Sequence, residues 1–135
     1  MALQLSVAVR NAMLDAIETT IGTSAVLKIR TGAPPASVAT ADSGTVLATL
    51  TLPSDWIAAA SSGSKAKNGT WEDASADAAG TAAHYRIYAS DGTTAHLQGT
   101  VTATGGGGDL VVDNAVFAAG QSFSITSFSI TAPNS

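Results

Sequence analysis

The stretch SFSITSFSIT, residues 122–131, repeats a five-residue unit and alternates small polar with large apolar side chains. An alternation with a period of two is typical of a half-buried β-strand, so the repeat predicts one long strand or two short ones. Because the unit has an odd length, Phe123 and Ile125 fall on odd positions and Phe128 and Ile130 on even ones. All four can face one core only if a bulge at the junction of the copies adds a residue. Without it, the second pair forms an exposed apolar patch.

A single substantial helix is predicted over residues 6–21. Apolar residues recur there every four positions and form a stripe, which consists of Leu5, Val9, Met13, Ile17 and Ile21. Ser6 is a favourable N-cap and Gly22 is a favourable helix terminator. We expect the stripe either to cover the protein's own sheet, which is the commoner arrangement, or to contact a neighbouring subunit.

The rest of the chain predicts about eight strands separated by short turn signals. The clearest alternating segments are residues 25–30, 46–52, 82–89, 95–101, 109–113 and 122–131. This pattern favours an all-β, two-sheet sandwich, with a jelly roll as the first choice and an immunoglobulin-like sandwich as the second. A length of 135 residues fits one domain, residues 1–135, with the helix at 6–21 and the sandwich at 25–131.

The segment 82–102 predicts a hairpin around Gly92. A two-residue loop would mix apolar and polar faces, whereas a three-residue loop with Gly92 in the left-handed conformation gives one apolar face of odd-numbered residues. His84 and His96 then lie on the outward face, too far apart along the strands to share one metal ion. We expect both to be solvated.

Composition limits the classes of function. Hydrophobic residues make up 45% of the chain but aromatic residues only 5%, which predicts a thin core suited to assembly with partners. Six Lys and Arg residues are scattered in a chain of net charge −4, so we expect no nucleic-acid partner. No apolar run approaches the roughly 20 residues of a membrane span. The start of the chain has no signal-peptide pattern, and we expect synthesis in the cytoplasm.

Motifs of catalysis and of metal or cofactor binding are not found. The run Gly105–Gly108 resembles a phosphate-binding loop only in its glycine content and predicts a flexible loop tip. The aspartates lack the spacing of a calcium loop, there is no Gly-x-Ser-x-Gly elbow, and the chain has no cysteine. We therefore predict a non-enzyme with no catalytic, cofactor-binding or metal-binding residues and no cofactor.

Apolar residues are instead the candidates for a binding surface. Trp56 and Trp71 are expected to fill the core, with interface anchoring as the alternative, because Trp is enriched where proteins meet. The candidate interface residues are Leu5, Val9, Trp56, Trp71, Phe128 and Ile130.

Four segments carry a resemblance to a known group of proteins. They are LKIRTGAPP at 27–35, SGTVLATLTL at 43–52, GTAAHYRIYASDGTTAHLQGTV at 80–101 and GGGGDLVVDNAVFAAGQSFSITSFSIT at 105–131. The chain resembles small virion proteins of tailed phages, of the head decoration or cement type with a jelly-roll fold. The resemblance covers nearly the whole chain, and its motifs are structural.

The resemblance implies a capsid decoration protein on the outer head surface, which clamps neighbouring major capsid subunits after synthesis in the host cytoplasm. Its expected partners are the major capsid protein and further copies of itself, as a dimer or trimer, without nucleic acid or membrane. A phage tail or adaptor component remains an alternative. A carbohydrate-binding module or hydrolase on the same fold is a further alternative, which the low aromatic content disfavours.

Overall fold

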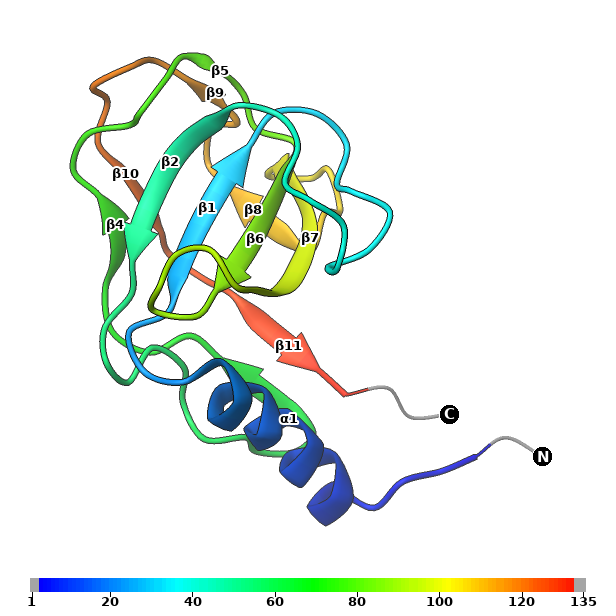
Figure 1. Ribbon diagram of the computed structural model, residues 1–135. Coiled ribbons are helices and arrows are strands. Elements are labelled where there is room, and N and C mark those ends of the chain that lie inside the picture. Colours follow the sequence, from blue (N-terminus) through cyan, green and yellow to red (C-terminus); the bar gives the residue numbers. More distant parts are fainter. Residues whose placement is uncertain (1–2, 133–135) are drawn as a thin grey trace.

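A computed structural model describes residues 3–132, which form one helix and eleven strands (Figure 1). The elements are α1 (Val7–Ile21), β1 (Val26–Arg30), β2 (Val46–Thr51), β3 (Ser64–Ala66), β4 (Trp71–Asp73), β5 (Gly80–Thr81), β6 (His84–Tyr88), β7 (Ala95–Ala103), β8 (Leu110–Val112), β9 (Val116–Phe117), β10 (Phe123–Ile125) and β11 (Ser129–Thr131). The mostly β composition predicted from the sequence is confirmed, and the strands are shorter and more numerous than expected.

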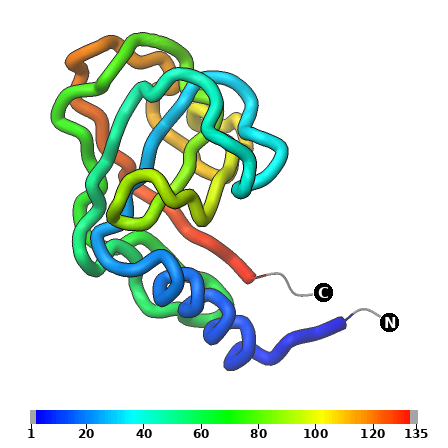
Figure 2. The backbone as a smooth tube through the Cα atoms, viewed as in Figure 1, coloured from blue at the N-terminus to red at the C-terminus, as the bar shows by residue number. Residues whose placement is uncertain are grey.

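The main sheet has five strands in the order β2-β1-β6-β7-β8. Its neighbouring strands are antiparallel except for the last pair, β7 and β8, which are parallel. Three two-stranded ladders accompany it, namely β10–β4, β11–β3 and β5–β9. Figure 2 shows that both ends of the described chain lie on the same side of the molecule, next to α1 and β11.

The repeated pentapeptide forms two strands with different partners. Its first copy contributes β10, which pairs with β4, and its second contributes β11, which pairs with β3. Residues 126–128, which connect β10 to β11, belong to neither strand. This interruption lets odd-numbered residues of the first copy and an even-numbered residue of the second copy face the core. Phe123, Ile125 and Phe128 are buried and Ile130 packs against the core. The predicted break is confirmed, and it separates two short strands rather than bulging one long strand.

An aromatic cluster fills the space between the main sheet and the small ladders. Phe128 packs against Trp71 and Tyr85, with ring centroids 5.4 Å and 5.8 Å away. Trp56 lies 6.0 Å from Trp71, and the Trp71 indole donates to the Trp56 carbonyl over 3.0 Å. Both tryptophans are fully buried, so the alternative of interface anchors is wrong for Trp56 and Trp71, and core filling is confirmed.

The hairpin of β6 and β7 has the predicted parity. Ile87 lies opposite Leu97 and Gly92 has a φ of 70°, as expected. The connection is longer than three residues, because the Ala89 amide donates to the Thr94 carbonyl across residues 90–93. An irregularity in the strand pairing between Ile87 and Tyr88 accommodates the extra loop residue.

The glycine run makes a close return between β7 and β8. Parallel neighbours usually need a crossover of a dozen or more residues, but Ala103 and Leu110 are joined by residues 104–109 alone. A Cβ on Gly106 would lie 2.5 Å from the Thr102 Cβ, and one on Gly108 would lie 2.9 Å from the Thr102 Oγ1. Positions 106 and 108 therefore need glycine because any side chain there would collide with Thr102 of β7. The sequence predicted only a flexible loop tip and not this close contact.

Candidate interaction surface

Helix α1 is oriented differently from the prediction. Its bounds agree, since the Ser6 Oγ accepts from the Val9 amide over 3.2 Å and Gly22 ends the helix with a φ of 89°. The buried helix residues, however, are Leu14 and Ile21. Val9 and Met13, which belong to the predicted apolar stripe, are each 46% exposed. Much of the stripe therefore faces away from the protein's own core.

Two charged residues of α1, Asp15 and Glu18, bind a buried lysine, although the Asp15 side chain stays 49% exposed. Lys65 of β3 is fully buried, and its Nζ lies 2.7 Å from the Asp15 Oδ1 and 2.8 Å from the Glu18 Oε2. Asp15 also accepts from the Ala60 amide over 2.9 Å. Arg10, the third charged residue of the helix, donates to the Ala132 carbonyl over 3.0 Å. The helix is held on the protein by this polar clamp as much as by apolar packing.

The clamp changes the acidity of its members. The hydrogen bond from Lys65, followed by that from the Ala60 amide, lowers the pKa of Asp15 below its ordinary 3.8. Burial disfavours the charged form of Lys65, but its hydrogen bonds to Asp15 and Glu18 outweigh burial, so the pKa of Lys65 is raised above 10.5. Both groups are therefore charged across the neutral range, and the ion pairs persist there.

The solvent side of α1 consists mainly of apolar and small side chains, and the half-exposed Asp15 lies beside them. We define its outer face as the exposed residues Ala8, Val9, Ala12, Met13, Ala16 and Thr20. Ala8, Ala12 and Ala16 recur every four residues and line one side of the helix. Like an ordinary surface helix, α1 buries apolar residues, namely Leu14 and Ile21, but it also leaves Val9 and Met13 exposed on this outer face.

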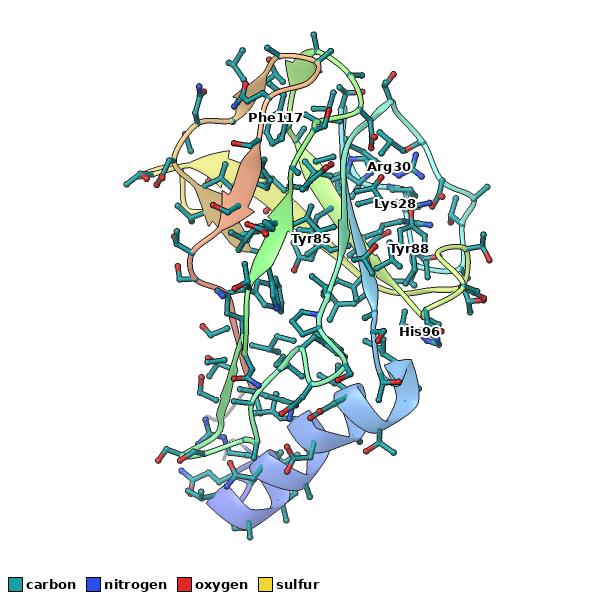
Figure 3. The ribbon with its side chains drawn as sticks, turned by 90° about the vertical axis from the view of Figure 1, so that its left-hand side faces the viewer. Lys28, Arg30, Tyr85, Tyr88, His96 and Phe117 are labelled. Carbon is teal, nitrogen blue, oxygen red and sulfur yellow. The ribbon has the colours of Figure 1, made fainter. Side chains whose placement is uncertain are left out.

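An apolar groove of about 340 Å³ continues this face toward the main sheet. Met13, Ile17 and Ile21 form its helix side, and His96 and Leu97 of β7 form its other side. His96 projects near the end of α1 (Figure 3), and it is exposed as predicted. The outer face and the groove together make a surface of apolar and small side chains.

The predicted interface residues do not form one patch. Val9 belongs to the outer face of α1, and Leu5 is half-buried just before the helix. Phe128 is in the core and Ile130 is partly covered, so neither forms an exposed apolar patch. Neighbours of the predicted stripe, such as Ala12 and Ala16, turn out to share the outer face with Val9. Their four-residue spacing was the sequence signal for this face.

A second polar cluster lies on the other face of the main sheet, where the sequence predicted solvated side chains. Lys28, Arg30 and Tyr88 point to this side and Tyr85 to the opposite one (Figure 3). The loop 31–45 covers this face, and Arg86 donates to the Ser37 and Thr40 carbonyls beneath it. His84 is fully buried here, so the expectation that it is solvated is wrong.

Asp42 is the acidic centre of this cluster. Its carboxylate lies 2.7 Å from the Arg86 Nη1 and 2.8 Å from the Arg30 Nη2, and it accepts from the Tyr88 hydroxyl over 2.9 Å. Partial burial raises the pKa of Asp42, but the Tyr88 hydrogen bond and the two guanidinium groups outweigh it and lower the pKa below 3.8. These contacts attach the loop 31–45 to β1 and β6. We therefore assign Asp42 a structural role.

His84 contributes a further tie to this loop. Its Nδ1 lies 2.7 Å from the Gly32 carbonyl, which can only accept, so Nδ1 carries the proton. His84 Nε2 and Arg30 Nε are buried without a hydrogen-bond partner among residues 3–132. His84 on β6 lies directly opposite Arg30 on β1 in the strand pairing. Neither residue lines the groove beside α1.

Two shallow grooves flank β11 on the remaining surface. One contains Lys67, Val111 and Ser127, and the other contains Tyr85 and Gln98, while Asp109 lines both. Burial, followed by the nearby charge of Asp109, raises the pKa of Tyr85 well above 10.0. Tyr85 therefore stays a neutral phenol near the Asp109 carboxylate at neutral pH.

Within the described part of the chain, no group of three or more His, Cys, Asp or Glu side chains is placed to hold a metal ion. In the same residues, no helix has the length and apolar character required to cross a membrane. Comparison with protein-family models, with curated proteins and with solved structures found no match. The outer face of α1 is therefore the feature on which a functional argument can be built.

Proposed function

We propose that this protein is a structural component of a phage virion, most specifically a decoration or cement protein on the outer surface of the head. In this role it clamps neighbouring major capsid subunits, and its partners are the capsid protein and further copies of itself. The proposal starts from the resemblance of four segments to such proteins, which covers nearly the whole chain.

One structural observation carries the proposal, namely the exposed apolar and small side chains on the outer face of α1. Exposed Val9 and Met13 gain free energy when a partner removes them from water, by about 25 cal/mol per Å² of apolar surface. Lys65 binds Asp15 and Glu18, so a partner on the outer face meets mainly small and apolar side chains, with the half-exposed Asp15 at the edge of that face. Such a face suits permanent contact with protein better than exposure to solvent.

The fold fits the same role. We propose that the five-stranded sheet and the small ladders form a two-sheet sandwich of the jelly-roll kind, with the aromatic cluster around Phe128 between the layers. The sandwich is held by local packing and polar clamps. Many copies that each bind weakly can together attach firmly to a capsid, because multivalent attachment raises the overall affinity.

Quantitative mass spectrometry of purified virions, with the heads separated from the tails, tests this function. The expected result is a copy number in the hundreds, confined to heads and comparable with that of the capsid protein. A few copies confined to tails would favour the tail or adaptor alternative, and absence from virions would contradict both roles. When purified protein is added to heads that lack it, it should bind in the same copy number as on complete virions.

A further inference from the structure

We infer that Arg30, Arg86 and Tyr88 form a carboxylate-binding site, that Asp42 of the loop 31–45 fills this site from within the chain, and that a carboxylate of a partner protein displaces Asp42 and releases the loop. This inference deepens the proposed function and rests on it only for the partner, which is a protein of the phage head that presents an acidic side chain. The site itself is built by this chain alone.

The three side chains converge on both oxygens of one carboxylate. Arg86 Nη1 and the Tyr88 hydroxyl donate to Asp42 Oδ1 over 2.7 Å and 2.9 Å, and Arg30 Nη2 donates to Asp42 Oδ2 over 2.8 Å. The donors belong to β1 and β6, and all three are more than nine-tenths buried. The carboxylate, in contrast, belongs to an exposed residue of a loop. A buried set of charge-assisted donors thus holds a ligand that is carried by an exposed segment.

The site contains more positive charge than Asp42 balances. Lys28 on β1 lies directly opposite Arg86 on β6, and Arg30 lies two residues further along β1. Among residues 3–132, Asp42 is the only carboxylate that forms an ion pair with any of these three cations. Like charges directly opposite each other on neighbouring strands destabilise a sheet. The cluster therefore favours the binding of a carboxylate.

Arg30 keeps an unused donor beside Asp42. Its Nε is buried without a hydrogen-bond partner in the described part of the chain, although the Nη2 of the same guanidinium binds Asp42. A carboxylate that is not constrained by the loop can accept from Nε and Nη2 together, in the bidentate arrangement that a guanidinium favours. Asp42 therefore does not use all the donors that the site offers to a carboxylate.

The attachment of the loop 31–45 permits its release. None of its residues is buried, so it contributes nothing to the apolar core. Besides the ion pairs of Asp42, Arg86 and Gln98 hold the loop through its backbone carbonyls. Water can replace these carbonyls when the loop leaves, whereas only another anion can replace Asp42 beside the cations. Opening is therefore unfavourable until a second carboxylate arrives.

A docked protein is a better source of this carboxylate than a free anion. The chain has a net charge of −4, which repels small anions, and the tethered Asp42 competes at a high effective concentration. A protein that is held on the chain by further contacts gives its own acidic side chain the same advantage. The site should therefore respond to contact with the capsid and bind dilute free anions only weakly.

Asp42→Ala tests the site because it removes the internal ligand. We expect sodium acetate to shift the NMR signals of the Arg30 and Arg86 Nε–H groups of this variant in a saturable way, and sodium chloride at equal ionic strength to leave them unchanged. The unmodified chain should bind acetate at least about tenfold more weakly, because the tethered Asp42 competes. Asp113→Ala, at an exposed aspartate, is the control and should match the unmodified chain.

Asp42→Asn is the second variant and keeps the test valid if Asp42→Ala does not fold. The amide retains the shape of the carboxylate without its charge, so this variant should also bind acetate more tightly than the unmodified chain, with an unchanged circular dichroism spectrum. Acetate binding by neither variant, or binding no tighter than that of the unmodified chain, would overturn the inference.

Binding to heads that lack the protein tests the displacement of Asp42. We expect Asp42→Ala to half-saturate the heads at a protein concentration at least about threefold lower than the unmodified chain needs, because no internal carboxylate has to leave first. A purely structural Asp42 predicts equal or weaker binding of the variant, and either result would reject the displacement.

The two proposals fail separately. Acetate binding by the Asp42 variants of a protein that is absent from virions would reject the decoration role and keep the site. Attachment to heads by a protein whose Asp42 variants bind no acetate would keep the role and reject the site.

Discussion

The Arg86 Nη1 lies 2.7 Å from the Asp42 Oδ1, which joins strand β6 to a loop residue 44 positions earlier in the chain. Arg86 is 2% exposed, whereas the Asp42 side chain is 33% exposed. The same guanidinium reaches Gln98 and the carbonyls of Ser37 and Thr40. The loop 31–45 is therefore fixed on the sheet by side chains more than by strand pairing.

Asp42→Asn should loosen this loop. The substitution keeps the shape but leaves Arg86 and Arg30 without their carboxylate, and we expect a loss of about 2 kcal/mol because Asp42 is partly solvated. Urea unfolding measures the loss, and hydrogen exchange should locate it in residues 31–45. Asp113→Asn, at an exposed aspartate, is the control and should change neither. Equal effects of the two substitutions would refute the role given to Asp42.

Acid should weaken the attachment of α1. Because the folded pKa of Asp15 lies below the ordinary 3.8, its ion pair stabilises the fold above that pH and is lost as pH falls through the folded value. We expect the Ala60 amide, which donates to Asp15, to exchange faster at such acid pH before the main sheet does. Lys65→Met removes the largest cause of the lowered Asp15 pKa and leaves only the Ala60 hydrogen bond, so the acid dependence should shrink. An undiminished dependence in that variant would contradict the clamp.

The two apolar residues of the second pentapeptide copy should differ in mutational cost. Phe128→Ala removes a ring packed between Trp71 and Tyr85, and we expect it to cost about 3–4 kcal/mol. Ile130→Ala removes a partly exposed side chain and should cost only about 1 kcal/mol. Thermal and denaturant unfolding compare the pair. Similar losses of unfolding free energy in the two variants would contradict the placement of Phe128 in the core and of Ile130 at its edge.

The glycine run should tolerate side chains unequally. Gly106→Ala forces a Cβ against Thr102 and should cost about 1–3 kcal/mol as overpacking. Gly107→Ala meets no atom within 4 Å, and its φ of 75° adds only about 1 kcal/mol of backbone strain. Hydrogen exchange of the Thr104 amide, which bonds to the Val112 carbonyl, reports on the β7–β8 pair. It should accelerate in the first variant and stay unchanged in the second.

Alkali should ionise the tyrosines only as the protein unfolds. Burial and then Asp109 raise the pKa of Tyr85, and burial followed by the hydrogen bond to Asp42 raises that of Tyr88. Since both folded values exceed the ordinary 10.0, stability is full below pH 10.0 and falls as pH rises beyond it. Tyrosinate absorbance should therefore appear together with loss of circular dichroism. A separate, earlier ionisation would contradict the burial of both phenols.

Local signals predicted much of this fold correctly. The Ser6 cap, the Gly22 terminator, the left-handed Gly92 and the parity break in residues 122–131 depend on neighbours in the chain and agree with the structure, whereas the predicted three-residue loop at Gly92 is too short. The candidate site was predicted only in part. Val9 was selected because it belongs to an apolar stripe, and the direction of that stripe could not be read from its spacing.

The errors come from contacts between distant segments. His84 lies on a face that alternation assigns to solvent, but the loop 31–45 covers that face. Likewise, Asp15 and Glu18 of α1 bind Lys65, which is some fifty residues away and fully buried, and the helix pattern alone does not predict this partner. A periodic pattern identifies two sides of a helix or strand, and only the partner on each side decides which becomes the interior.

The tight return between β7 and β8 also bears on how the chain folds. Most parallel strand pairs join segments far apart in sequence, so they lose much chain entropy on closing and form slowly. Here Val101 pairs with Leu110, so a parallel ladder closes a loop as short as that of a long hairpin. Residues 84–112 can therefore form both an antiparallel and a parallel strand contact locally, and this segment is suited to nucleate the sheet before the distant strands β1 and β2 join it.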